Sequence, residues 1–235
     1  MTPEDLELAK EGVKESVKQM FAPVQDVVHQ LVGPSATEVG LMWGDFFRVR
    51  RLKNAVRLFQ DVKQIASQAG FELKPVAPRL LLPILEAASL QDDEDLHWRW
   101  VALLTNAATS ADSVHPSFIE ILRQLAPPDA RLLDQLYDAW KSHPRRAVNP
   151  WGGPITYAER ERLVGEGKDP TPAFQNLLRL RLVEIEYRMD KPVEAKVTKV
   201  GTAKFSPKMD SHYLFTEVAA RFVEACHAPK KRSDV

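Results

Sequence analysis

The chain has 235 residues, of which 44% are hydrophobic and 27% charged, and its 32 basic residues balance its 32 acidic ones. This composition is typical of a globular protein and excludes a chain that is disordered throughout. A net charge of zero argues against a dedicated nucleic-acid coat, which would be strongly basic.

The single cysteine, Cys226, has no partner for an internal disulfide, which favours a reducing compartment. The charged N-terminal residues lack the apolar core of a signal peptide, and no apolar run reaches the length of a membrane-spanning helix. We therefore expect a cytoplasmic protein.

Two long helices are predicted at the start of the chain. Residues 3–32 form the first, which Pro23 is expected to kink or divide, and residues 35–69 form the second. Gly70 is expected to end the second helix because glycine readily adopts the left-handed conformation found after helix ends.

The second helix has a basic face between residues 46 and 63, where Asp61 is the only acid. Its basic residues are Arg48, Arg50, Arg51, Lys53, Arg57 and Lys63. An amphipathic basic helix is a candidate contact for an anionic membrane or for nucleic acid. The alternative is a solvated face that pairs with acidic neighbours such as residues 92–95, and both interpretations stay open.

The central stretch is predicted to be helical and well packed. Pro83 is expected only to kink a helix at residues 76–90. The acids at 92–95 begin the next helix, because carboxylates are favourable at the positive end of the helix dipole. The core face of this helix is Leu96, Trp100, Leu103 and Leu104. We expect His97 to pack its ring and to bond a carboxylate of the preceding junction.

Two further helices follow, at residues 116–126 and 128–141, and His115 is placed to cap the first of them. Residues 142–156 read as a loop, followed by a short helix at 157–164.

The last third of the chain changes its pattern. Thr171 caps a helix, and alternating apolar and charged residues at 183–188 then predict a strand. A second strand at 212–216 leads into a final helix capped by Thr216. Helix, strand, loop, strand and helix describe a winged-helix-like arrangement.

A winged helix that reads DNA places a helix in the major groove and its wing on phosphates. The candidate contacts here have basic or amide side chains: Gln175, Asn176, Arg179, Arg181, Lys196, Lys199 and Lys204. Winged helices also serve as protein-interaction modules, so binding to nucleic acid is an alternative and not the leading interpretation.

No recognisable catalytic or metal-binding motif occurs in the sequence. The six histidines lack zinc-site spacing, the acids at 92–95 do not match a calcium loop, and phosphate-binding loops and nucleophile elbows are missing. We therefore expect a non-enzymatic protein with no catalytic residue, metal or cofactor.

Several short motifs recur in the order seen in a known family: Pro83-Ile84-Leu85-Glu86-Ala87-Ala88-Ser89, Asp93-Glu94-Asp95-Leu96, Trp100-Val101-Ala102-Leu103-Leu104-Thr105-Asn106-Ala107, His115-Pro116-Ser117-Phe118, Asn176-Leu177-Leu178-Arg179-Leu180 and Leu214-Phe215-Thr216. With these motifs the chain resembles the abortive infection alpha family, long classed as a domain of unknown function. The resemblance covers roughly residues 35–228. One departure is Leu180-Arg181-Leu182, where the family usually has glycine between the leucines.

The resemblance implies bacterial anti-phage defence by abortive infection, and it supplies no catalytic residues. We expect a mainly α protein in which a helical bundle precedes a winged-helix-like part with a small β-hairpin. The predicted divisions are an N-terminal helical segment (1–34), a central bundle (35–141), the winged-helix-like part (142–228) and a disordered tail (229–235). The expected partner is a protein, phage or membrane component, and a homo-oligomer is a further expectation.

Overall fold

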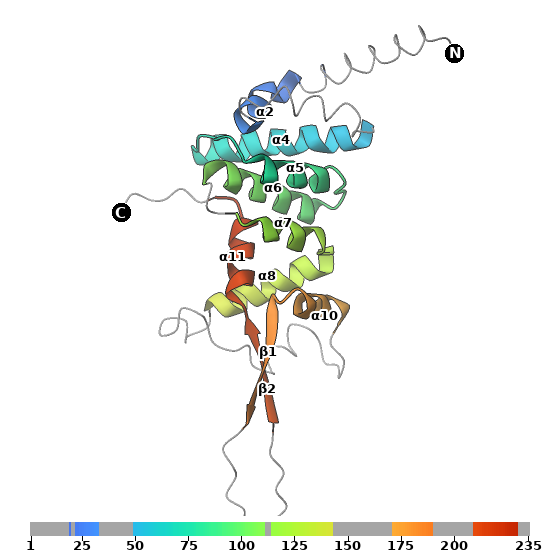
Figure 1. Cartoon of the computed structure of the whole chain (residues 1–235), viewed down its shortest axis with the longest axis vertical. Coiled ribbons are helices and arrows are strands. Elements are labelled where there is room, and N and C mark those ends of the chain that lie inside the picture. Colours follow the sequence, from blue (N-terminus) through green and yellow to red (C-terminus); the bar gives the residue numbers. More distant parts are fainter. Residues whose placement is uncertain are drawn as a thin grey trace, which may run out of the picture. The chain divides into compact units, whose positions relative to one another are not determined.

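The structure, a computed structural model, describes residues 19, 22–32, 49–110, 114–142, 171–189 and 209–229. These residues are mainly helical and include one two-stranded antiparallel hairpin (Figure 1). The predicted mainly α fold with a small hairpin is thereby confirmed, and the winged-helix likeness stays a prediction. The expected helix at 157–164, the loop at 142–156 beyond Ser142, and the N-terminal part of the second helix lie outside the described residues.

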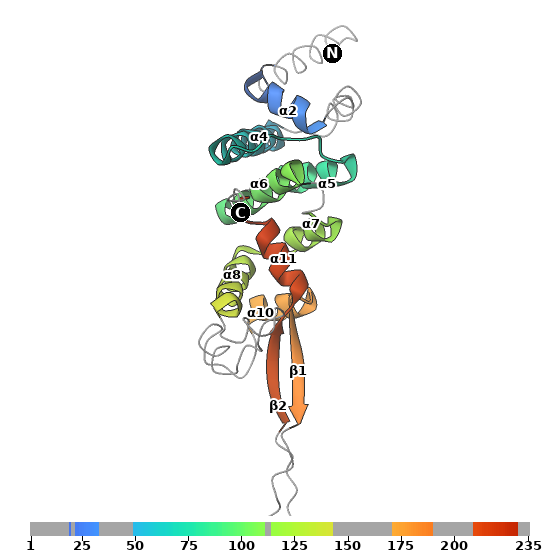
Figure 2. The same ribbon diagram turned by 90° about the vertical axis from the view of Figure 1, so that its left-hand side faces the viewer.

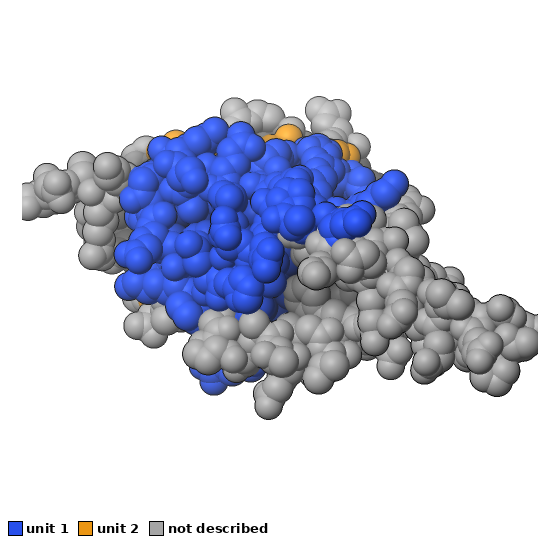
Figure 3. Space-filling view, turned by 90° about the horizontal axis from the view of Figure 1, so that it is seen from above, with its two compact units in different colours: residues 1–127, 224–235 blue, residues 128–223 orange. Residues whose placement is uncertain are grey.

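The chain forms two compact units, residues 1–127 with 224–235 and residues 128–223 (Figure 3). The predicted domain boundaries remain predictions, because they fall in or beside segments outside the described residues.

The first unit is a stack of helices. In chain order, those among the described residues are η1 (Ala22–Val24), α2 (Gln25–Val32), α4 (Val49–Ala69), α5 (Pro78–Ala88), α6 (Glu94–Thr109) and α7 (Pro116–Arg123). Helix α4 packs against α2 on one side and against α5 and α6 on the other, and α7 packs beyond α5 and α6 (Figures 1 and 2). Pro83 lies inside α5, which continues unbroken to Ala88.

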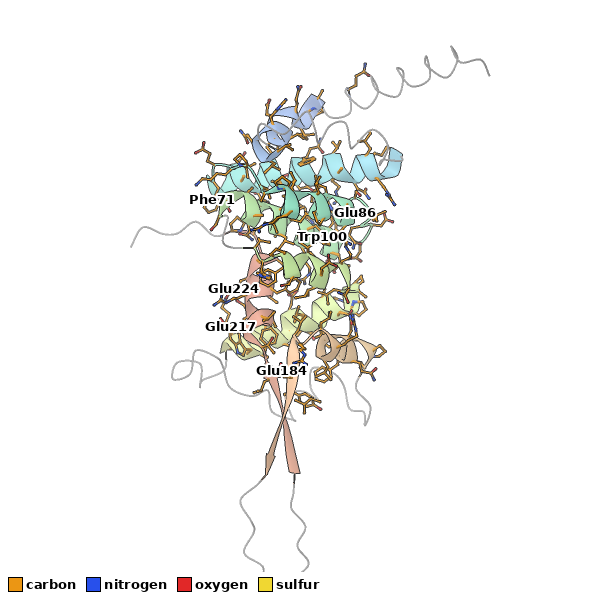
Figure 4. The ribbon with its side chains drawn as sticks, viewed as in Figure 1. Phe71, Glu86, Trp100, Glu184, Glu217 and Glu224 are labelled. Atoms are coloured by element: carbon orange, nitrogen blue, oxygen red, sulfur yellow. The ribbon has the colours of Figure 1, made fainter. Side chains whose placement is uncertain are left out.

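Helix α6 is the centre of this unit. It buries residues around most of its circumference, including Trp100, which is 1% exposed (Figure 4). Phe59 and Val62 of α4 are completely buried as well. The core face predicted for α6 is confirmed, and burial extends beyond it because helices cover α6 on two sides.

The helix starts follow local sequence chemistry. The side chain of Asp93 accepts a hydrogen bond from the backbone N–H of Leu96 (3.1 Å) and so caps α6. Nδ1 of His115 accepts from the backbone N–H of Ser117 (3.2 Å) at the start of α7. Both capping roles confirm the predictions, since a side-chain acceptor satisfies a backbone donor that has no partner in the first helical turn.

The described part of the second unit contains three helices and the hairpin. They are α8 (Pro127–Ser142), α10 (Pro172–Arg179), β1 (Val183–Met189), β2 (Met209–Phe215) and α11 (Glu217–Ala225). The first residue of α8 and the last two residues of α11 belong to the first unit. The strands pair in register from Val183 opposite Phe215 to Met189 opposite Met209.

Aromatic packing holds the base of the hairpin. The Phe215 ring lies 5.5 Å from that of Trp140, and Tyr213 meets Phe174 edge-on at 5.0 Å. Val183 and Phe215 are buried, whereas Ile185, farther along β1, is 38% exposed. An isolated two-stranded hairpin is only marginally stable, so its stability depends on this anchored base.

Helices α4 and α10 end in the same backbone motif. After α4, the N–H of Phe71 bonds the carbonyl of Ala66 (2.9 Å) and Gly70 has a φ of 69°. After α10, the N–H of Leu182 bonds the carbonyl of Leu177 (3.0 Å), and the left-handed position is occupied by Arg181 with a φ of 55°. This is the Schellman ending, in which glycine is the preferred residue. A residue with a Cβ in this conformation costs about 1–2 kcal/mol.

Candidate interaction surface

A polar network connects helices α4 and α6. Nε2 of buried His97 lies 2.7 Å from Oδ2 of Asp61. Arg57, one turn before Asp61, places its Nε 3.7 Å from the same carboxylate and its Nη2 2.5 Å from Oε1 of Glu94. The indole N–H of Trp98 donates to that Glu94 oxygen at 3.1 Å. The network therefore runs from the core of the unit to the surface.

Exposure increases along this network. The side chain of His97 is 3% exposed and that of Asp61 16%, whereas those of Arg57 and Glu94 are 45% and 59% exposed. Because exposed ion pairs contribute only about 0–1 kcal/mol each, the outer part of the network adds little stability. Its main effect is to fix the positions of the side chains it joins.

The outer ion pair shifts the pKa of both partners. The hydrogen bond from Arg57 is the largest cause that lowers the pKa of Glu94 below its ordinary value; burial opposes it, and the positive charge of Arg57 adds to the lowering. The same hydrogen bond raises the pKa of Arg57. Both groups are therefore charged at neutral pH, which keeps Glu94 an acceptor for Trp98.

Trp98 is a large apolar side chain that reaches solvent. Among the described residues the exposed large hydrophobic side chains are Leu90 (54%), Trp98 (41%), Ile185 (38%) and Val218 (49%). Trp98 is an aromatic side chain held by a hydrogen bond to an anchored carboxylate, and tryptophan is enriched at the energetic centres of protein interfaces. We define Trp98, Glu94 and Arg57 as the Trp98 surface.

The predicted basic face of α4 is only partly accounted for. Arg48 and the side chain of Arg50 lie outside the described residues, Arg51 is half-buried and Lys53 is exposed. Arg57 pairs with Glu94. Lys63, with its Nζ 4.0 Å from Asp26, also has an acidic neighbour. These two contacts favour the alternative of a solvated face that pairs with nearby acids.

The apolar side of α4 is occupied by the core. Leu52, Val56, Phe59 and Val62 are all buried within the first unit. A helix that lies on a membrane inserts its apolar face, so the described part of α4 would have to leave the core to do so. Membrane contact through the basic face alone stays a prediction.

The candidate contacts on α10 are used in different ways. Nδ2 of Asn176 donates to Oδ2 of buried Asp129 (2.7 Å), and Oδ1 of Asn176 accepts from Arg179 Nε (3.0 Å) and Nη2 (2.7 Å). These bonds give Asn176 a structural role inside the second unit. Gln175 and Arg181 are exposed, and Lys196, Lys199 and Lys204 lie outside the described residues.

The position predicted for the partner of His97 was wrong. The carboxylate belongs to Asp61 on α4 and not to the junction before α6, because the imidazole points into the interface between the two helices. The sequence reasoning also missed Asn106, whose Nδ2 donates to the carbonyls of Ala225 (2.9 Å) and His227 (2.8 Å). The only indication of this role in the sequence was an amide side chain within the apolar residues of α6.

Within the described ranges, no group of three or more His, Cys, Asp or Glu side chains is arranged to hold a metal ion. In the same part of the chain, every helix is too short or too polar to cross a membrane.

The fold defines a mainly helical protein that ends in a hairpin and a helix, with a braced aromatic residue at its surface. The family model described as abortive infection alpha matches residues 50–226, from α4 to the end of α11. The match covers more than half of the chain, and the protein belongs to the abortive infection alpha family, as the sequence resemblance predicted. No curated protein and no solved structure matches the chain.

Proposed function

We propose that this protein defends a bacterial cell against phage by abortive infection. The observation that carries the proposal is the family match over residues 50–226, which includes the second unit and much of the first. The protein acts in the cytoplasm and without catalysis, by binding a protein or phage component.

The Trp98 surface is the contact through which we expect this binding. Truncating tryptophan at the centre of an interface often costs 2 kcal/mol or more of binding energy, so about a thirtyfold loss of affinity is expected. Glu94 holds the indole edge, and Arg57 and Asp61 connect Glu94 to the buried His97. A side chain that is already held loses less conformational entropy when a partner binds.

Phage challenge of cells with and without the gene tests the defence role. We expect cells that carry the gene to reduce plaque formation, and an infected culture to lose its infected cells without releasing phage. Equal plaque numbers across a broad phage panel would contradict the proposal. Isolation of the wild-type protein from infected and uninfected cells would then identify the component that it binds.

A further inference from the structure

Arg181 occupies a position in which its backbone conformation favours glycine. Its φ of 55° is the only positive value of a non-glycine residue among those the structure describes. The equivalent position after α4 is Gly70, with a φ of 69° and the same pair of backbone hydrogen bonds. The chain thus uses glycine at one such ending and a long basic side chain at the other.

The backbone contacts of Arg181 do not require an arginine. Its N–H donates to the carbonyl of Leu178 (3.0 Å), and its carbonyl accepts from Oγ1 of Thr216 (3.0 Å). Glycine would make both bonds without strain. Whatever favours arginine at this position therefore depends on the side chain.

Among the described residues, the guanidinium of Arg181 makes no contact that explains its presence. The side chain is exposed, and within the described ranges it takes part in no ion pair or hydrogen bond. Other arginines have partners: Arg57 pairs with Glu94, Arg179 with Asn176 and Arg221 with Glu217. Strained residues retained in a fold cluster at functional positions, which makes Arg181 a candidate for one.

We propose that Arg181 is a recognition residue whose guanidinium binds a carboxylate of a partner protein. The planar guanidinium matches a carboxylate through two parallel hydrogen bonds. Glu184 at the base of β1 and Glu217 at the start of α11, both labelled in Figure 4, are exposed. In the sequence, Glu184 is three residues from Arg181 and Glu217 is next to Thr216, whose hydroxyl bonds the carbonyl of Arg181. Glu217 is paired with Arg221, so this surface carries both signs of charge, which complements a protein surface of mixed charge better than the uniformly negative backbone of a nucleic acid.

The strain is tested first by exchanging the residues of the two endings. We expect Arg181→Gly to raise Tm by about 2–4 °C, and Gly70→Arg to lower it by a similar amount. Arg181→Lys, which keeps both the charge and the strain, should leave Tm unchanged. An unchanged or lower Tm for Arg181→Gly would overturn the premise that arginine is retained at a cost.

A plaque assay tests whether Arg181 takes part in recognising a partner. Despite its higher stability, Arg181→Gly should lose at least tenfold of the protection that the wild type gives in a plaque assay, and Arg181→Lys should keep part of it. Equal protection by Arg181→Gly and wild type would overturn the inference. This assay rests on the proposed defence role. If the wild-type protein itself gives no protection, the defence role is contradicted and not the inference about Arg181.

Chemical cross-linking tests for the partner's carboxylate without relying on the protection assay. Carbodiimide treatment of cells that express Arg181→Lys should join position 181 to an Asp or Glu of a different protein. That protein should copurify with the wild type and at least tenfold less with Arg181→Gly. Linkage only within this chain or to a second copy would contradict a foreign partner, as would equal copurification. Retention on duplex DNA at low salt that Arg181→Gly abolishes would identify phosphate as the ligand instead.

Discussion

Asn106 connects the central helix to the C-terminal end of the chain within the first unit. Its amide donates to the carbonyl of Ala225, which has no helical partner in the last turn of α11, and to that of His227, two residues farther on. Asn106→Ala should lower the free energy of unfolding by about 1–3 kcal/mol, because both carbonyls lose their donor. Urea unfolding measures this, with Gln64→Ala on the exposed side of α4 as the control. A change no larger than that of the control would show that the two bonds add nothing.

Glu94 makes part of the stability depend on pH. Because its folded pKa is lowered, its contribution is present above the unfolded value of 4.5 and is lost as the pH falls through the folded pKa. Glu94→Gln should therefore weaken the loss of stability below about pH 4.5. Unfolding midpoints between pH 7 and pH 3 measure it, and Glu72→Gln is the control. Identical profiles for Glu94→Gln and wild type would refute this role of the ion pair.

At the scale of elements, Thr216 joins the start of α11 to the end of α10. Its Oγ1 accepts from the N–H of Ala219 (3.1 Å) and donates to the carbonyl of Arg181. Thr216→Val should lose about 1–2 kcal/mol, because it removes a cap as well as the link, whereas Thr216→Ser should retain most of the stability. Equal thermal stability of the two variants would contradict the role of the hydroxyl.

The helix ends were predictable because their chemistry is local. Asp93, His115, Thr171 and Thr216 each cap the residues that follow them directly, so the sequence contains both partners within three positions. The link from His97 to Asp61 spans 36 positions, and no periodicity specifies which carboxylate a buried imidazole meets. The ion pair of Arg57 with Glu94 agrees with the alternative in which the basic face pairs with residues 92–95, whereas the position of Trp98 beside this pair was missed.

For the whole molecule, apolar periodicity predicted the helical class, and alternation predicted the hairpin. Periodicity identifies which face of a helix is buried, but not which helix covers that face. The central position of α6, and the division into two units at residues 127 and 224, therefore became evident only from the structure. The family resemblance, carried by residues such as Trp100 and His115, was confirmed over residues 50–226. Most of those residues form the core or cap helices, so they report the fold more than the binding surface.

We propose that defence depends on the Trp98 surface, and the plating efficiency of phage on cells that express matched variants measures this dependence. Trp98→Ala should lose at least tenfold of the protection, while Val218→Ala, which truncates a similarly exposed apolar side chain on α11, should keep it. Both proteins should unfold within about 2–4 °C of wild type, since neither side chain is buried. Wild-type protection by a folded Trp98→Ala protein would contradict the account.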